Sequence, residues 1–124
     1  MMTYLLVGVG GALGAMGRHF CSEIIDSHVP SFPFGTLFVN VTGSFLIGVI
    51  TAYVIFRTGL QNWRLFLVTG FLGGFTTFSS FSLATVRLMQ NGLFLSAFLN
   101  VLANVALCLL MTGMGFYLVS GTLR

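Results

Sequence analysis

The chain has 124 residues, of which 56% are hydrophobic and 6% charged, and its mean hydropathy is +1.03. A soluble domain carries roughly 25% charged residues, so this composition excludes an ordinary soluble enzyme or binding module. The net charge of +3 arises from five arginines and two acids, without lysine, and provides no polybasic patch for nucleic acid. Since a spanning helix needs about 20 apolar residues, the sequence predicts a single-domain, all-α integral membrane protein with four transmembrane helices.

The first predicted helix covers about residues 3–25. Its N-terminus lacks the positive region of a cleaved signal peptide, so we expect this helix to be retained. Gly10 and Gly14 form a GxxxG motif, and with Gly17 they make a smooth ridge for close packing of another helix, within the chain or between subunits. The same glycines lack the βαβ context of a dinucleotide-binding loop. Arg18 is expected to snorkel toward the interface or to line a wet vestibule.

A polar connection and a second helix follow. Residues 23–33 contain both acids and both prolines and predict a helix end with a short connection. In the second predicted helix, about residues 34–56, Thr36, Asn40 and Ser44 recur every four residues and therefore share one face. Asn40 is costly, because a carboxamide in hydrocarbon must find hydrogen-bond partners or water. It either lines a pore or bonds neighbouring helices together.

The third predicted helix covers about residues 65–88 and carries the stretch GFLGGFTTFSSFS at 70–82. Gly73 and Gly74 weaken the helix, because glycine is poor in helix interiors. The sequence therefore predicts a broken third helix, with the break at these glycines. Backbone carbonyls that a break exposes at membrane depth are tolerated only where protein, ion or water satisfies them. The break thus indicates a binding site or a conduction path.

A row of phenylalanines accompanies the break, at spacings of four, three and three residues: Phe71, Phe75, Phe78 and Phe81. The edge of a phenylalanine ring is electropositive through its quadrupole. Ring edges turned inward would stabilise a small anion weakly, whereas ring faces turned inward would favour a cation. Ordinary packing of the row is the alternative.

The fourth predicted helix covers about residues 93–119. A second polar stripe at intervals of four runs along it, made of Asn100, Asn104, Cys108 and Thr112. Two helices with polar stripes suggest a path lined by polar side chains. The alternative is hydrogen bonding between helices, worth about 0.6 to 2 kcal/mol per contact. Cys21 and Cys108 lie in apolar contexts without metal-ligand spacing, so we assign them no redox role.

The arginines are almost evenly divided between the two sides of a four-span protein. Arg57, Arg64 and Arg124 fall on one side, and Arg18 and Arg87 fall on the other. Such a small positive-inside bias predicts insertion in both orientations. An antiparallel, dual-topology homodimer of inverted copies would follow, as a two-chain version of the inverted repeats of larger transporters.

The chemistry of the spans indicates which ion such a path would carry. No acidic residue lies within the second, third or fourth predicted helix, which argues against a proton-coupled cation exporter. The polar groups that these helices do contain are asparagine amides and hydroxyls, which donate hydrogen bonds. That chemistry suits a small anion that must pass rather than stay.

Three motifs together resemble the Fluc (CrcB) family of bacterial fluoride channels: GGFTTFSSFS at 73–82, GTLFVNVTGSF at 35–45 and GGALGAMGR at 10–18. The resemblance extends over the whole chain in order. It implies a multi-pass protein of the bacterial inner (cytoplasmic) membrane, an antiparallel homodimer with two fluoride pores. Cytoplasmic fluoride would leave through them passively, which gives fluoride resistance. The resemblance implies a channel and not an enzyme, with fluoride, lipid and a second copy as its partners.

The resemblance also implies roles for individual residues. The implied fluoride-pore residues are Phe78, Phe81, Asn40, Ser80 and Thr36. The backbone carbonyls of Gly73 and Thr76 from both subunits are implied to bind a structural sodium ion (Na+), and Arg18 matches the arginine of the first helix. In the last helix, relatives often carry a tyrosine and hydroxyl residues, whereas this chain has Asn100, Asn104 and Cys108 in that polar track.

Two rival classes share some of these features. A small proton-coupled exporter of the multidrug type has similar length and four spans, but it would need an acidic residue at mid-membrane. A holin-like or purely structural membrane protein would share the glycine ridges. Such a protein would not need polar stripes on two helices that flank a broken third.

Overall fold

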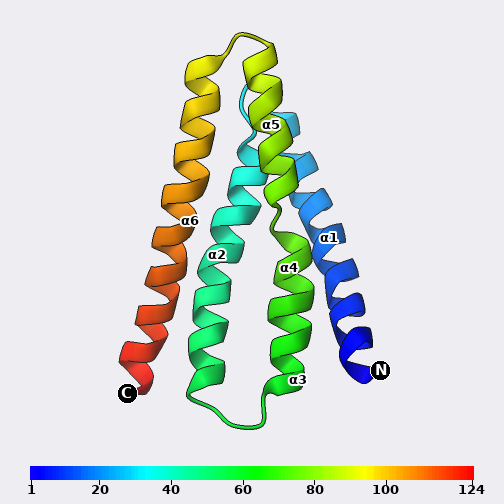
Figure 1. Cartoon of the computed structure of the whole chain (residues 1–124), viewed down its shortest axis with the longest axis vertical. Helices are drawn as coiled ribbons and strands as arrows, with labels where there is room; N and C mark the ends of the chain where they lie inside the picture. The colour runs from blue at the N-terminus through cyan, green and yellow to red at the C-terminus, as the bar shows by residue number, and fades with distance from the viewer.

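The computed structural model describes residues 1–124 as an all-helical chain without strands (Figure 1). Its elements are α1 (Met2–His28), α2 (Phe34–Ile55), α3 (Gln61–Arg64), the π-helical η1 (Leu65–Leu72), α4 (Gly73–Phe75), α5 (Phe78–Gln90) and α6 (Phe94–Leu123). α3, η1 and α4 continue into one another, and α5 follows after a two-residue break. We call Gln61–Gln90 the third helix.

Three of these helices are long and apolar enough to cross a membrane: α2, the third helix and α6. α1 has 27 residues, which at a rise of about 1.5 Å per residue span roughly 40 Å. It is less apolar than the others because glycines, Arg18 and both acids lie within it.

The helix bounds differ from the expected ones mainly at polar ends. α1 continues past residue 25 to His28, so that Asp26, which was expected after the helix end, is still helical. The Asp26 carboxylate accepts the Gly35 N–H at 2.9 Å and so satisfies a free donor at the start of α2. The third helix starts at Gln61 rather than near 65, and α6 extends from 94 to 123 rather than from 93 to 119.

The helices run alternately up and down, with α1 at one side of the view, α6 at the other, and α2 and the third helix between them (Figure 1). Both termini and the α2–α3 loop lie at one end, and the α1–α2 and α5–α6 connections lie at the opposite end. The loops on either side of the third helix contain Gly59 (φ 79°) and Gly92 (φ 76°). These positive φ angles favour glycine.

Facing glycines let α1 pack closely on the third helix. A Cβ at Gly10 would fall on the Phe66 carbonyl oxygen, and one at Gly14 would fall on the Phe71 carbonyl oxygen. From the other side, a Cβ at Gly74 would meet the Gly11 carbonyl oxygen. The glycine ridge of the first helix is therefore used within the chain, as a membrane packing surface of small residues.

α2 and α6 form a second extensive helix pair, comparable to that of α1 with the third helix. Gly48 lies against the Thr112 carbonyl and Gly115 against the Phe45 carbonyl, so that each backbone approaches the other. The Thr112 hydroxyl also donates to the Ser44 carbonyl at 3.0 Å. Thus the last member of the fourth-helix stripe bonds two helices together.

Most of the chain is exposed. Only 19 of 124 residues are buried, and large apolar side chains cover the outer faces of α1, α2 and α6. Exposed apolar surface on this scale marks contact with a membrane or with another protein chain. The structure therefore agrees with an integral membrane protein.

Candidate functional site: a polar junction at the broken helix

The predicted break is present in the third helix, but it lies at Thr76 and Thr77 rather than at the two glycines. Thr76 (φ −85°, ψ 156°) and Thr77 (φ −152°, ψ 120°) are extended. Gly73 (φ −61°, ψ −36°) is helical, and Gly74 lies within α4. The placement at the glycines was wrong because Gly74 serves the close contact with α1 instead.

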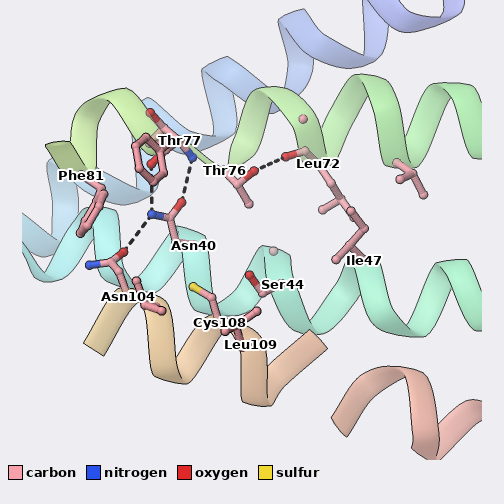
Figure 2. Close-up of a pocket in the computed structure, with 15 residues that line it drawn as sticks. Asn40, Ser44, Ile47, Leu72, Thr76, Thr77, Phe81, Asn104, Cys108 and Leu109 are labelled. Atoms are coloured by element: carbon pink, nitrogen blue, oxygen red, sulfur yellow. Dashed lines mark hydrogen bonds between the residues drawn. The ribbon is translucent and has the colours of Figure 1, made fainter. Parts of the chain in front are cut away.

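The side chain of Asn40 from α2 bridges this break. Its Oδ1 accepts the Thr77 N–H at 2.8 Å, and its Nδ2 donates to the Thr77 carbonyl at 3.1 Å (Figure 2). The Thr77 hydroxyl then caps α5 by accepting the Ser80 N–H at 3.1 Å. Asn40 thus replaces the helical partners that Thr77 lacks.

These bonds free two carbonyl groups. In a continuous α-helix, the Gly73 carbonyl would accept the Thr77 N–H and the Thr76 carbonyl would accept the Ser80 N–H. Here Asn40 takes the first N–H and the Thr77 hydroxyl takes the second. The carbonyls of Gly73 and Thr76 are therefore among those that lose their helical partners at the break.

Arg18 lies beside the break. Its Nε donates to the Gly74 carbonyl at 3.0 Å, and its side chain is half-buried. Because α1 extends ten residues beyond it, Arg18 is far from either end of that helix. It satisfies a third carbonyl that the break would otherwise leave free.

Polar side chains connect the break to α6. Asn40 Nδ2 also donates to Asn104 Oδ1 at 3.0 Å, and Asn104 Nδ2 donates to Asn100 Oδ1 at 3.0 Å (Figure 2 shows the first of these bonds). Asn100 Nδ2 donates to the Thr85 hydroxyl at 2.9 Å, and that hydroxyl donates to the Phe81 carbonyl at 2.8 Å. No buried side-chain nitrogen or oxygen lacks a partner.

Two cavities lie near the junction. The first, of about 390 Å³, is bounded by α2, the third helix and α6, and its lining includes Asn40, Gly73, Thr76, Phe78, Phe81, Asn104 and Cys108 (Figure 2). The second, of about 430 Å³, lies next to the α1–α2 and α5–α6 connections, and its lining includes Asp26, Thr36, Ser80, Arg87 and Asn91.

The expected site residues therefore fall into groups. Asn40, Phe78 and Phe81 line the first cavity, and Thr36 and Ser80 line the second. Asn104 lines the first cavity, whereas Asn100 is fully buried and lines neither. The structure thus places these residues, and their roles toward an ion stay predictions.

The break divides the phenylalanine row into two pairs. Phe71 and Phe75 stack with ring centroids 5.8 Å apart, and Phe75 lies against Gly17 of α1. Phe78 and Phe81 meet edge to face at 5.3 Å and line the first cavity. Only the second pair lines that cavity.

The sequence reasoning missed three residues at or near these cavities. Thr77 forms the junction with Asn40, Thr85 anchors the bonds from α6, and Arg87 brings a positive charge to the second cavity. Thr77 carried a signal, because threonine is one of the residues preferred at a helix N-cap.

No charged side chain lines the first cavity. Its polar groups are amides, hydroxyls and backbone carbonyls, and the protein has no cluster of His, Cys, Asp or Glu suited to a metal. The fold and this site define an all-helical, multi-pass membrane protein with an uncharged polar junction at a broken helix.

Comparison with known proteins identifies the family. A family model described as CrcB-like protein, Camphor Resistance (CrcB), matches residues 5–116. This chain belongs to the CrcB family.

Similar curated proteins carry the name fluoride-specific ion channel FluC. The one from Granulibacter bethesdensis is 52% identical over 100 residues, which cover 78% of this chain and 79% of the relative. The one from Geobacter sulfurreducens is 50% identical over 118 residues, with 93% and 94% covered. The one from Hydrogenobaculum sp. is 43% identical over 118 residues, with 94% and 97% covered.

Proposed function

We propose that this chain is a fluoride channel, and not an enzyme, that lets cytoplasmic fluoride leave passively across the bacterial inner membrane. The name of the similar curated proteins, fluoride-specific ion channel FluC, supports fluoride as the ion. The observation that carries the proposal is the uncharged first cavity at the broken helix, which the Phe78–Phe81 pair and Asn40 line together. A proton-coupled exporter is disfavoured because no carboxylate lines that cavity.

The cavity chemistry suits a small, strongly hydrated anion. Amide N–H groups and electropositive ring edges partly replace its water, and the absence of lysine or arginine keeps it from being trapped. Larger halides are rejected by the width of the path. Thr36 and Ser80 extend the polar lining toward the second cavity, whose lining includes the positive charge of Arg87 and the negative charge of Asp26.

The assembly that we propose is an antiparallel homodimer with two pores, in which α1 is the fourth span. Its 27 residues are long enough for a hydrocarbon core of about 30 Å. The exposed apolar faces of the single chain support a second copy as partner.

We further propose a structural sodium ion at the same junction. The carbonyls of Gly73 and Thr76 have lost their helical partners and belong to residues that line the first cavity. Oxygen atoms are the ligands that hard cations prefer. Two carbonyls are too few for one ion, so a second copy of the chain would supply the remaining ligands.

Fluoride efflux from liposomes tests the proposal. Purified protein is reconstituted with sodium present, and release of fluoride is followed with an electrode beside identical liposomes loaded with chloride. We expect rapid fluoride release while chloride is retained.

Two phenylalanine variants locate the path. Phe81→Ile removes a ring from the first cavity and is expected to abolish release without changing the gel-filtration volume. Phe98→Ile is the matched control, because that ring is 61% exposed on α6 and lines neither cavity. No fluoride release from well-folded wild-type protein would overturn the proposal in favour of an exporter or a structural role.

A further inference from the structure

The hydrogen bonds between Thr77 and Phe81 form a side-chain relay, Asn40–Asn104–Asn100–Thr85, that runs through α2, α6 and α5. The relay begins and ends on the backbone of the third helix, at the Thr77 peptide and at the Phe81 carbonyl. Every link is between 2.8 and 3.0 Å. Asn104 is 5% exposed and Asn100 is 0% exposed, so water does not compete for most of these bonds.

The two backbone ends fix the direction of every bond. A carbonyl can only accept, so the Thr85 hydroxyl donates its single proton to Phe81 and is left as an acceptor for Asn100 Nδ2. Asn100 Oδ1 therefore faces Asn104 Nδ2, which also donates to the Asn100 backbone carbonyl at 2.9 Å. Asn104 Oδ1 then faces Asn40. At the other end, the Thr77 N–H can only donate, and it requires Asn40 Oδ1.

We propose that Thr85, Asn100 and Asn104 are positioning residues that hold the Asn40 carboxamide in one orientation at the first cavity. This inference rests on the proposed channel function. Asn40 and Asn104 line the first cavity, whereas Thr85 and Asn100 line neither cavity and act only through the relay. Asn104 Oδ1 accepts the second N–H of Asn40 and so keeps it at the wall of the first cavity. An anion in the cavity can replace Asn104 Oδ1 as the acceptor of this N–H.

Removing the Thr85 hydroxyl, at the far end of the relay, should therefore change the surroundings of the Asn40 carboxamide. Without the Thr85 hydroxyl, Asn100 Nδ2 has no acceptor and its carboxamide is free to turn. Asn104 Nδ2 would then lose the Asn100 side-chain acceptor and keep only its bond to the Asn100 backbone carbonyl at 2.9 Å. The Asn104 oxygen that accepts from Asn40 would be held by one bond fewer, while Asn40 keeps its two bonds to Thr77.

The experiment removes that hydroxyl without changing the shape of the side chain. Thr85→Val is expected to lower fluoride efflux about fivefold, which corresponds to about 1 kcal/mol, the typical net value of one hydrogen bond. Thr85→Ser, which keeps the hydroxyl, is expected to restore efflux. The matched control is Thr112→Val, because the Thr112 hydroxyl also bonds two helices but lies outside the relay.

A second readout observes Asn40 directly and does not require transport. In ¹⁵N-labelled protein in micelles, the side-chain amide signal of Asn40 is assigned by its loss in Asn40→Ser. We expect this signal to move in Thr85→Val and to stay in place in Thr85→Ser and Thr112→Val. Should Thr85→Val fail to fold, Thr85→Ala removes the same hydroxyl with a smaller side chain.

The outcomes separate the relay from the channel function. Wild-type efflux with an unmoved Asn40 signal in Thr85→Val would overturn the relay, as would equal losses in Thr85→Val and Thr112→Val. If wild-type protein releases no fluoride, the channel proposal fails by itself, and the Asn40 signal still decides whether the relay exists.

Discussion

At the scale of single residues, Asn40 is central because its carboxamide matches one peptide group. Its carbonyl accepts the Thr77 N–H while its amino group donates to the Thr77 carbonyl. An aspartate could not do both, since an ionised carboxylate only accepts. The bond to Asn104 uses the remaining N–H. Thus Asn40 bonds helices together and lines the first cavity at once, and the two roles considered for it from the sequence do not exclude each other.

Asn40→Asp tests this match. The carboxylate keeps the bond from the Thr77 N–H, but it turns an acceptor toward the Thr77 carbonyl and the Asn104 oxygen. We expect fluoride efflux to be lost and the free energy of unfolding to fall by about 1–3 kcal/mol, the cost of unpaired buried polar groups. Efflux and chemical denaturation measure the two effects.

The matched control is Asn62→Asp, the same change at an exposed position of α3. Its free energy of unfolding should stay within about 0.5 kcal/mol of wild type. Efflux of Asn40→Asp at the wild-type rate would show that the anion does not meet this amide.

How much of the site the sequence predicts depends on the range of each interaction. The spacing of Asn100 and Asn104 placed them on one face, which is a local property of a helix. The cost of burying Asn40 indicated that it needs partners. It could not indicate which ones, because Thr77 lies 37 residues away and Asn104 lies 64 residues away. Only the packing of α2 between its neighbours decides those pairs.

At the scale of elements, the position of the break shows the same limit. Glycine propensity placed it at Gly73 and Gly74, yet both are helical. The break lies where another helix supplies replacement hydrogen bonds, and Asn40 reaches Thr77. Propensity alone is a weak guide when tertiary contacts compete with it. The existence of the break was predictable, and its position was not.

The glycines of α1 give a prediction at this scale. Gly14→Ala places a Cβ on the Phe71 carbonyl, so α1 and the third helix must separate. Overpacking of this kind costs about 1–3 kcal/mol, and we expect a lower thermal unfolding midpoint, followed through the fluorescence of Trp63.

Gly8→Ala is the control on the same helix, because a Cβ there meets nothing within 4 Å. Alanine is the better helix former by up to about 1 kcal/mol, so this variant should be as stable as wild type or slightly more so. If both variants unfold alike, the glycine ridge does not set the distance between the two helices.

At the scale of the whole molecule, sodium is expected to stabilise the assembly. A ligand that binds only the folded state raises stability in proportion to the logarithm of its concentration. We expect the unfolding midpoint to rise with sodium and not with N-methylglucamine at equal ionic strength. Thr76→Ser keeps the backbone carbonyl, so its unfolding midpoint should respond to sodium like that of the wild type. Equal midpoints in both salts would argue against a sodium site.

The orientation of the chain in the membrane depends on how the arginines are divided between the two ends of the helix bundle. Arg18 is held at the break by the Gly74 carbonyl, so its charge is not counted at either end of the helix bundle. Arg57, Arg64 and Arg124 then lie at the end that holds both termini, and Arg87 lies toward the other. The charge bias between the two ends is therefore larger than the sequence count of three against two.

The position of the break allows the proposed antiparallel pair in spite of this bias. Thr76 and Thr77 lie near the middle of the 30-residue third helix, so two inverted copies would bring their freed carbonyls to the same height. Two parallel copies would also do so, and only orientation distinguishes the two arrangements.

Labelling from one side of the membrane separates these arrangements. Thr58→Cys and Asn91→Cys place a thiol in the loops at opposite ends, each in a background with Cys21 and Cys108 replaced by alanine. An impermeant maleimide added outside intact cells should label about half of the copies of either variant if insertion is dual. Complete labelling of one loop with full protection of the other would establish a single orientation, and the dimer would then have to be parallel.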